Sequence, residues 1–326
     1  MSDQKFKVFV TRKIPDTGIK LLKQAGFQAS VSSFDGVLPR PDLLKKVKGV
    51  DAILSLLTDK MDAELMDAAG PQLKIIANYA VGTDNINLDD AAARNITITN
   101  TPGVLTEAVA ELAFALMMSA ARRIPESDQF TRKGKYKGWA PMMMLGSELH
   151  HKILGIIGLG RIGSAVAERA FFGFKMKIIY YDVKRNEEFE QKFQAEYRGL
   201  PGLLRDADFI SIHVPLIPET KHLIGKNELK IMKKTAYLIN TSRGPIIDEA
   251  ALVDALKKKR IAGAGLDVYE NEPKLSPGLK DLPSAVLTPH TGSATIETRS
   301  AMAELAAKNI IEVLNGRAPL TPVKKP

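Results

Sequence analysis

An apolar run that leads directly into a glycine-rich turn constrains the fold of this chain more than any other feature. Residues 153–157 read Ile-Leu-Gly-Ile-Ile, and Gly158, Gly160 and Gly163 follow at GxGxxG spacing. In such a loop the first glycine permits a tight turn, the second lets the backbone approach a pyrophosphate, and the third allows close packing of helix on strand. A helical pattern over 164–172 would direct free N–H groups at the phosphates. The segment predicts a dinucleotide-binding unit.

An acidic residue follows the next apolar run, at the position where a dinucleotide fold binds ribose. Asp182 comes directly after 177–181 and lies 19 residues beyond Gly163. A carboxylate there accepts hydrogen bonds from the adenosine ribose and repels a 2′-phosphate, which favours NAD over NADP. Lys184 and Arg185 follow closely and could soften that preference, so NADH is preferred and NADP stays possible. A domain for FAD or S-adenosylmethionine is the main competing interpretation.

Short apolar runs alternate with helical patterns along the chain, which predicts an α/β fold with parallel sheets. The length of 326 residues fits about two domains. A helix over 105–121 is apolar around most of its circumference, so we expect it to be buried between layers or subunits. In the first hundred residues, strands are expected at 7–10, 27–32, 52–56, 73–78 and 96–100, and helices at 15–24, 41–47, 63–69 and 88–94. A loop or arm at 132–146, a second α/β block over 152–289 and a last helix at 296–314 complete the prediction.

The composition excludes several classes of protein. The chain has no cysteine, which excludes disulfides, thiolate metal sites and cysteine nucleophiles. Histidines and acids are not grouped at ligand spacing, so no metal site is expected. No uncharged apolar run approaches the roughly 18 residues of a membrane span, and the first residues do not resemble a secretory signal. We therefore expect a cytoplasmic protein.

A formal net charge of +9 raises the question of nucleic acid binding. The basic residues are spread in small groups, and aromatic residues make up only 6% of the chain. Single-strand binding favours a basic groove interleaved with stacking side chains, which is absent from this sequence. The charge is better explained by solubility and attraction of small anions.

Three predicted strands of the second block end in chemically active residues. Arg243 follows the strand at 236–239, Glu270 and Glu272 follow the strand at 263–268, and His290 follows Pro289. Parallel sheets bind ligands at this edge, so the three positions offer a cation for a carboxylate, an acid–base group and an anion to orient it. Glu270, the alternative anion, is expected to be a solvated loop residue, and His213 a structural one.

With these residues and several further motifs, the chain resembles the D-isomer-specific 2-hydroxyacid dehydrogenase family, and within it the glyoxylate/hydroxypyruvate reductases. The motifs are GLGRIG with its downstream Asp, NTSRG, GLDVYENEP, TPHTGSAT and, in the first domain, NYAVGTDNI, so that the similarity runs nearly end to end. The resemblance implies two Rossmann/flavodoxin-like domains with an active-site cleft between them. Residues 101–291 would form the NAD-binding Rossmann domain, and residues 1–100 with 292–326 the substrate-binding, flavodoxin-like domain.

The resemblance also implies roles for the active residues. Arg243 would pair with the substrate carboxylate and polarise the keto oxygen, a bidentate task that suits a guanidinium. His290 would be the general acid, and Glu272 would hold its imidazole and favour the protonated form. The related formate dehydrogenases carry a glutamine as the partner of the histidine, so Glu272 argues against that activity.

Further positions match family residues that line the ligands. The backbone of Val81 and Gly82 would bind the substrate carboxylate, Leu57 would lie near the substrate, and Trp139 would either reach a neighbouring subunit's pocket or pack in a dimer. The expected cofactor-binding residues are Gly158, Gly160, Arg161, Ile162, Gly163, Asp182, Thr106, Val214, Pro215, Thr241, Ser242, Asp267 and Gly292.

The expected function is NADH-preferring reduction of glyoxylate or hydroxypyruvate to the 2-hydroxy acid by a homodimer that binds neither nucleic acid nor membrane. A D-lactate or phosphoglycerate dehydrogenase of the same family remains open, although the chain ends soon after the last helix, without the regulatory domain that many phosphoglycerate enzymes append. A different class of protein, an NAD-sensing interaction protein like the C-terminal-binding-protein corepressors, also remains open, because those proteins keep the same three residues.

Overall fold

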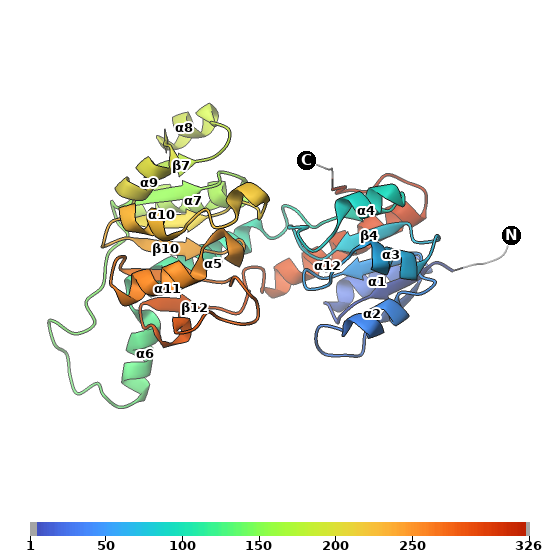
Figure 1. The fold of residues 1–326 in the computed structure, drawn as a ribbon, viewed down its shortest axis with the longest axis horizontal. Coiled ribbons are helices and arrows are strands. Elements are labelled where there is room, and N and C mark those ends of the chain that lie inside the picture. Colours follow the sequence, from blue (N-terminus) through green and yellow to red (C-terminus); the bar gives the residue numbers. More distant parts are fainter. Residues whose placement is uncertain (1–4, 324–326) are drawn as a thin grey trace. The chain divides into compact units, whose positions relative to one another are not determined.

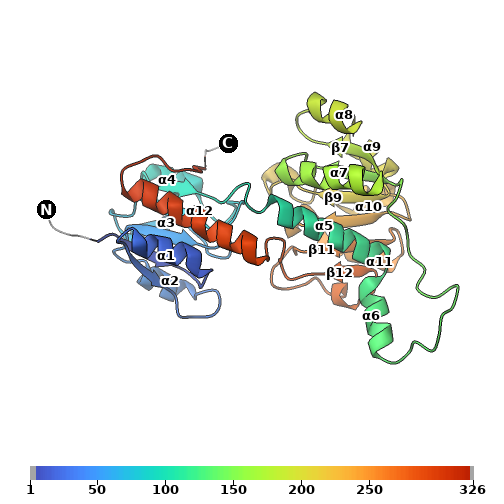
Figure 2. The ribbon, with the colours of Figure 1, turned by 180° about the vertical axis from the view of Figure 1, so that it is seen from behind.

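A computed structural model describes residues 5–323, and the chain divides into two units (Figures 1 and 2). Unit 1 comprises Met1–Leu105 and Ser293–Pro326, and unit 2 comprises Thr106–Gly292. The sequence placed the two divisions after residues 100 and 291, whereas the units divide after residues 105 and 292. Residues 1–4 and 324–326, the ends of the expected first domain, lie outside the described residues. Every strand pair within the two sheets of residues 5–323 is parallel, and the predicted α/β class is confirmed.

Unit 1 is a five-stranded sheet in the order β2-β1-β3-β4-β5. Strands β3 and β4 are buried along their whole length, which explains their continuous apolar sequence. Helices α1 and α12 pack against each other, and Figure 2 shows them in front of the sheet, with α2 and α3 on its other face. The elements are β1 (Lys7–Val10), α1 (Asp16–Gln24), β2 (Gln28–Val31), α2 (Arg40–Lys46), β3 (Ala52–Ser55), α3 (Ala63–Ala69), β4 (Ile75–Asn78), α4 (Leu88–Ala93), β5 (Thr97–Thr99) and α12 (Ile296–Leu314).

Unit 2 is a seven-stranded sheet in the order β12-β11-β10-β9-β6-β7-β8. The direction of winding reverses between β6 and β9, and open α/β sheets bind ligands beyond the carboxyl ends of the strands at such a point. The elements are α5 (Thr106–Ala121), α6 (Ile124–Arg132), β6 (Ile153–Ile157), α7 (Arg161–Phe174), β7 (Lys177–Tyr181), α8 (Glu187–Phe193), β8 (Glu196–Tyr197), α9 (Leu200–Asp206), β9 (Phe209–Ile212), α10 (Lys226–Ile231), β10 (Tyr237–Asn240), α11 (Glu249–Lys257), β11 (Gly263–Leu266) and β12 (Ala285–Leu287). Three short 3₁₀ turns lie at Pro218–Thr220, Gly244–Ile246 and Leu279–Asp281.

The apolar helix α5 packs on α7, β10 and β11, so it is buried within the layers of its own unit. Leu116 and Met117 are buried there, while Met118 remains exposed. The next helix, α6, has no buried residue, and the sequence had assigned no element to residues 122–131. Beyond it the chain forms an irregular arm that Figure 1 shows looping out from unit 2 before β6. None of the helices in residues 5–323 is long and apolar enough to cross a membrane.

Candidate active site

The glycine loop has the steric demands that its spacing implies. Gly158 has a φ of +93°, and a Cβ on it would lie 2.8 Å from the carbonyl carbon of His213. A Cβ on Gly163 would lie 2.0 Å from the carbonyl oxygen of Gly158. A Cβ on Gly160, by contrast, would meet no heavy atom of the protein within 4 Å. The fold therefore requires the first and third glycines, and the space beside the second is open to a ligand.

The acid after β7 lies beside this loop. The Asp182 carboxylate accepts a hydrogen bond of 2.7 Å from the backbone N–H of Leu159. A pocket of about 650 Å³, here called the Asp182 pocket, is lined by Leu159, Asp182, Lys184, Arg185, Asn186 and Glu187. Helix α7 begins at Arg161, directly after Gly160, and the free N–H groups of its first turn suit the pyrophosphate of a dinucleotide. The ribose contact of Asp182 itself stays a prediction.

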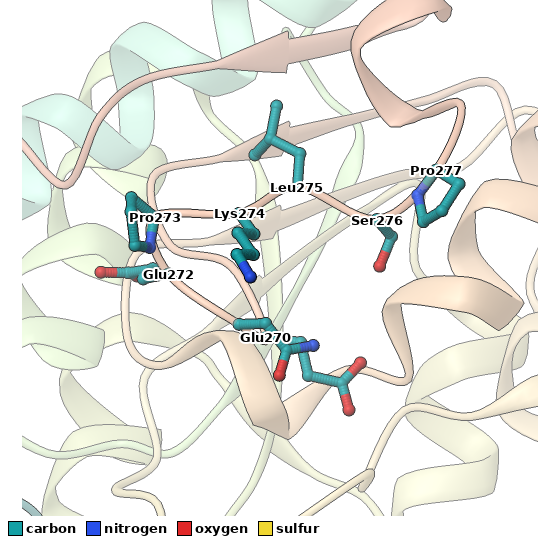
Figure 3. A pocket seen from close by; sticks show the side chains of 8 residues that line it. Glu270, Glu272, Pro273, Lys274, Leu275, Ser276 and Pro277 are labelled. Carbon is teal, nitrogen blue, oxygen red and sulfur yellow. The ribbon is translucent and has the colours of Figure 1, made fainter.

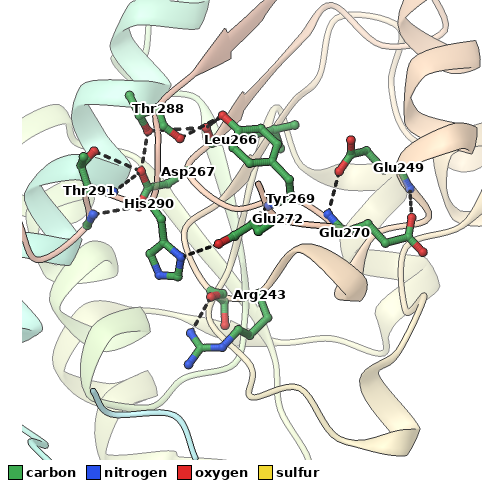
Figure 4. Close-up of polar contacts among 12 residues, drawn as sticks. Arg243, Glu249, Leu266, Asp267, Tyr269, Glu270, Glu272, Thr288, His290 and Thr291 are labelled. Carbon is green, nitrogen blue, oxygen red and sulfur yellow. Dashed lines mark hydrogen bonds and ion pairs between the residues drawn. The ribbon is translucent and has the colours of Figure 1, made fainter. Parts of the chain in front are cut away.

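His290 and Glu272 form a pair. The Nδ1 atom of His290 lies 3.0 Å from the Oε2 atom of Glu272, and a dashed line joins the two side chains in Figure 4. Pairing through Nδ1 leaves Nε2 as the nitrogen that can transfer a proton to a ligand. His290 has a φ of 54°, in a region that residues other than glycine rarely adopt. Its backbone is held in this conformation by a hydrogen bond of 2.9 Å from its N–H to the carbonyl oxygen of Asp267.

The environment of Glu272 keeps its carboxylate ionised. Burial raises the pKa of this carboxyl, but the hydrogen bond and charge of His290, the N–H of Tyr269 and the charge of Arg243 together hold the pKa below its ordinary value. The N–H of Tyr269 donates over 3.1 Å. An anion beside Nδ1 stabilises the protonated imidazole, which is the form a general acid needs.

Close packing of two loops brings Arg243 into electrostatic reach of this pair. A Cβ on Gly244 would lie 1.9 Å from the carbonyl carbon of Tyr269, so only glycine lets the turn after β10 lie against the loop that carries Glu272. The guanidinium donates a hydrogen bond of 2.9 Å to the carbonyl oxygen of Ser242 (Figure 4). The structure thus brings together the three residues that the sequence singled out.

Asp267 is buried and braces the loop that follows His290. Its carboxylate accepts hydrogen bonds from the Thr288 hydroxyl at 2.6 Å, the Thr291 N–H at 2.7 Å and the Gly292 N–H at 2.8 Å. These bonds give Asp267 a structural task that the motif alone did not indicate. Its expected contact with the cofactor, like that of Gly292, stays a prediction.

The structure corrects the interpretation of Glu270 as a solvated loop residue. Its carboxylate is half-buried, lies 2.6 Å from Nε2 of His222 and accepts from the N–H of Glu249 at 3.2 Å. Glu249, which sequence reasoning missed, is 3% exposed and accepts from the N–H groups of Glu270 at 2.8 Å and Ser276 at 2.7 Å. The one sequence signal is a carboxylate directly before the apolar residues 250–253, and its place in the first turn of α11 is known only from the structure.

The segment held by these bonds carries Glu272. Residues 270–277 line a pocket of about 670 Å³, drawn in Figure 3. Glu249 anchors both ends of the loop from Glu270 to Ser276, which includes the dyad carboxylate. The position of Glu272 therefore depends on a buried carboxylate from helix α11.

In unit 1, two asparagines orient the backbone at Val81 and Gly82. The side-chain amide of Asn100 donates to the carbonyl oxygen of Val81 at 2.7 Å, and that of Asn78 donates to Gly82 at 2.9 Å. In a trans peptide the N–H points away from the preceding carbonyl, so the N–H groups of Gly82 and Thr83 face the opposite side of the loop. Within residues 5–323 neither N–H donates a hydrogen bond to the protein, which suits an anion-binding loop.

The remaining predicted residues lie in unit 1 or unit 2 as follows. Leu57 is half-buried in the turn after β3, whereas Trp139 is 80% exposed on the arm. The Ser242 hydroxyl donates to the carbonyl oxygen of Val214, which joins the ends of β9 and β10. The hydroxyl of Thr241 is buried without a hydrogen-bond partner in the described chain. Thr106 opens α5, Arg161 and Ile162 form the first turn of α7, and Pro215 follows Val214.

His213, which directly follows β9, is a half-buried residue. Burial lowers the pKa of its imidazole to about 3. Its Nε2 atom lies 2.8 Å from the hydroxyl of Ser211. Over residues 5–323 no group of three or more His, Cys, Asp or Glu side chains is arranged to hold a metal ion.

Comparison with known proteins gives a consistent result. Residues 114–292 match the family described as D-isomer specific 2-hydroxyacid dehydrogenase, NAD binding domain. The chain is 53% identical over 323 residues to a glyoxylate reductase of Thermococcus litoralis, covering 98% of this chain and 97% of the relative.

Solved structures of the same family superimpose well on this fold. A glyoxylate reductase from Paecilomyes thermophila has a TM-score of 0.87 at 34% identity and covers 98% of both chains. An NADPH-dependent glyoxylate/hydroxypyruvate reductase from Sinorhizobium meliloti, solved with NADP and malonate, has a TM-score of 0.85 at 35% identity and covers 98% of this chain and 97% of its own. The chain therefore belongs to the D-isomer-specific 2-hydroxyacid dehydrogenases, a family of NAD(P)-dependent oxidoreductases.

Proposed function

We propose that this protein reduces glyoxylate or hydroxypyruvate to the corresponding 2-hydroxy acid, with NADH as its preferred electron donor. The observation that carries the proposal is the His290–Glu272 pair at 3.0 Å, with its carboxylate held ionised. Both residues lie at the strand edge of unit 2 that also carries Arg243 and the glycine loop. The glyoxylate reductases among the relatives support the substrate class.

In this reaction Arg243 binds and polarises the substrate. Its planar guanidinium suits a bidentate contact with the substrate carboxylate and a hydrogen bond to the keto oxygen. The N–H groups of Gly82 and Thr83, which point away from the carbonyls held by Asn100 and Asn78, would donate hydrogen bonds to a further carboxylate oxygen. Leu57 and Trp139 would set the size of the side chain that the substrate can carry.

His290 supplies the proton. A reduced nicotinamide cofactor would supply the hydride to the carbonyl carbon, and the carbonyl oxygen, which gains the π electrons, would then need a proton. The Nε2 proton of His290 is transferred to that oxygen, and the Glu272 anion stabilises the imidazolium before the transfer. Positioned acids of this kind contribute about 10²–10⁴ in rate.

The NADH preference rests on Asp182. Its carboxylate lies beside the glycine loop, where it would accept from the ribose hydroxyls and repel a 2′-phosphate. The S. meliloti relative, which is NADPH-dependent, shows that the other preference occurs at about one-third identity.

We also propose that the active form is a homodimer. Helix α6 and the arm expose large apolar side chains, among them Ile124, Tyr136, Trp139 and Met142. Trp139 is 80% exposed and Met142 is 77% exposed, which is unusual for side chains of this size on a monomer surface. A second copy of the chain is the occupant that we propose for this apolar surface.

The experiment follows the loss of reduced-nicotinamide absorbance with glyoxylate, hydroxypyruvate and pyruvate, each with NADH and with NADPH. We expect the highest kcat/KM for glyoxylate or hydroxypyruvate with NADH. Faster turnover of pyruvate would assign a D-lactate dehydrogenase instead. Tight NADH binding without turnover of any of these acids would contradict the proposal and favour a sensing protein of the same fold.

A further inference from the structure

We propose that Glu190 excludes NADPH by holding the guanidinium of Arg185 in an ion pair, so that Arg185 is withheld from a 2′-phosphate in the Asp182 pocket. The inference deepens the proposed NADH preference and rests on it, because it names the residue that keeps a nearby cation from reversing the effect of Asp182. Glu190 lies on α8, and Arg185 on the turn between β7 and α8.

The pair has the two-pronged geometry of a strong ion pair. Nε of Arg185 lies 2.8 Å from Oε1 of Glu190, and Nη2 lies 2.7 Å from Oε2. Two parallel charge-assisted bonds of this kind fix the orientation of the guanidinium plane. Arg185 therefore cannot turn toward another anion without breaking both bonds.

The carboxylate that holds Arg185 is itself held. The Tyr180 hydroxyl donates to Oε1 of Glu190 at 2.7 Å and accepts from the N–H of Asn186 at 2.7 Å. The Glu190 side chain is only 13% exposed, whereas that of Arg185 is 59% exposed. The hydrogen bonds from Arg185 and then from Tyr180 lower the pKa of Glu190 to about 2, so the carboxylate stays anionic across the physiological range.

The pair lies where the two nicotinamide cofactors differ. Arg185 lines the Asp182 pocket together with Lys184 and the acids Asp182 and Glu187. Guanidinium groups are the usual partners of a 2′-phosphate in this type of fold. Arg185 is a guanidinium in the expected place, but the carboxylate of Glu190 already compensates its positive charge. In the described chain Lys184 has no ion-pair partner, and a flexible ammonium recognises phosphate less specifically than a guanidinium fork.

Replacing Glu190 with glutamine tests whether its negative charge withholds Arg185 from the pocket. The variant Glu190→Gln keeps the size of the side chain and an oxygen that can accept from Tyr180, but it loses the negative charge. Arg185 would then be released toward the pocket, where a 2′-phosphate offers it a dianionic partner. The variant should therefore bind NADPH more tightly than the wild type does, and its preference for NADH over NADPH should decrease.

The test measures binding of adenosine 2′,5′-bisphosphate and adenosine 5′-monophosphate by isothermal titration calorimetry at fixed salt. We expect Glu190→Gln to tighten the bisphosphate about tenfold relative to the monophosphate, and the double variant with Arg185→Ala to lose this gain. Arg185→Ala alone should change the ratio by less than about twofold, because a withheld guanidinium contributes nothing. Glu187→Gln is the matched control, since it removes a carboxylate from the same pocket without releasing Arg185.

The proposal would be overturned by no change in Glu190→Gln, an equal gain in Glu187→Gln, a gain that survives in the double variant, or a large loss in Arg185→Ala. The last measurement does not depend on whether Glu190→Gln folds, since Arg185 is a surface residue. Failure of both nucleotides to compete with NADH would also overturn it. Because no readout involves turnover, an enzyme inactive on glyoxylate would contradict the proposed function and leave this result intact.

Discussion

Among single residues, the three glycines of the nucleotide loop serve different purposes. Gly158 and Gly163 have no room for a Cβ, whereas Gly160 has open space beside it. We predict that Gly160→Ala folds with an unchanged melting temperature but binds NADH at least tenfold more weakly, because the added methyl group occupies the path of the pyrophosphate. Differential scanning fluorimetry and NADH titration measure the two effects.

Gly163→Ala provides the comparison, because its Cβ would lie 2.0 Å from a backbone oxygen. This variant should melt well below the wild type. Equal losses of melting temperature in both variants would mean that Gly160 serves the fold rather than the ligand.

The ionised Glu272 should set the pH range of the reaction. The pKa of Glu272 is below its ordinary value, so the residue is an anion at neutral pH and favours the protonated His290 that reduction requires. In Glu272→Gln the imidazole lacks the anion that stabilises its protonated form. We predict that the alkaline limb of kcat/KM for glyoxylate moves down by about one pH unit or more, and a stopped-flow pH series measures it.

Glu270→Gln is the control for this prediction, since Glu270 pairs with His222 rather than with His290. Its alkaline limb should coincide with that of the wild type. If the alkaline limb of kcat/KM in Glu272→Gln lies at the same pH as in the wild type, Glu272 does not support the protonated form of His290 during the reaction.

At the level of structural elements, helix α11 holds the loop of the dyad through Glu249. This nearly buried carboxylate binds the N–H groups of Glu270 and Ser276, and a lost charged hydrogen bond in such a place costs about 1–3 kcal/mol. We predict that Glu249→Gln lowers both the melting temperature and kcat, while the dissociation constant of NADH stays the same. On the same helix, Asp254→Asn removes only an exposed pair with Lys258 and should change neither quantity. Unchanged kcat in Glu249→Gln would show that the loop keeps its place without this anchor.

The sequence was sufficient to predict those helices and strands whose apolar patterns are strong. Buried parallel strands such as β4 and β6 are continuous apolar runs, and their carboxyl ends meet at one edge, so the positions of Arg243 and His290 could be predicted from strand ends alone. Helix α6 could not be predicted because it buries no residue and thus has no apolar stripe.

The loop contacts could not be predicted for a different reason. The bonds from Asp267 to Gly292 and from Glu249 to Ser276 join residues that are 25 and 27 positions apart. They depend on how each loop returns to the sheet, which no local periodicity encodes. For the same reason Glu270 was misjudged as solvated, and the pairing of Arg185 with Glu190 required the structure.

For the whole molecule, the apolar surface of α6 and the arm predicts association. We expect light scattering to give the mass of a dimer at micromolar concentration. The double substitution Trp139→Ser with Met142→Ser removes two of the most exposed apolar side chains and should shift the protein toward the monomer. Val183→Ser is a control on a highly exposed apolar residue in another part of unit 2, and it should leave the mass unchanged. A monomeric wild type would contradict the proposed dimer.

We propose that His290, oriented by Glu272, protonates a small 2-oxo acid during its reduction. The most direct measurement compares the wild type with His290→Ala in single-turnover oxidation of enzyme-bound NADH by glyoxylate. We predict rapid formation of glycolate by the wild type and a rate about 10²–10⁴ lower in the variant, with NADH binding unchanged. A variant that reduces glyoxylate as fast as the wild type would show that His290 is not the proton donor.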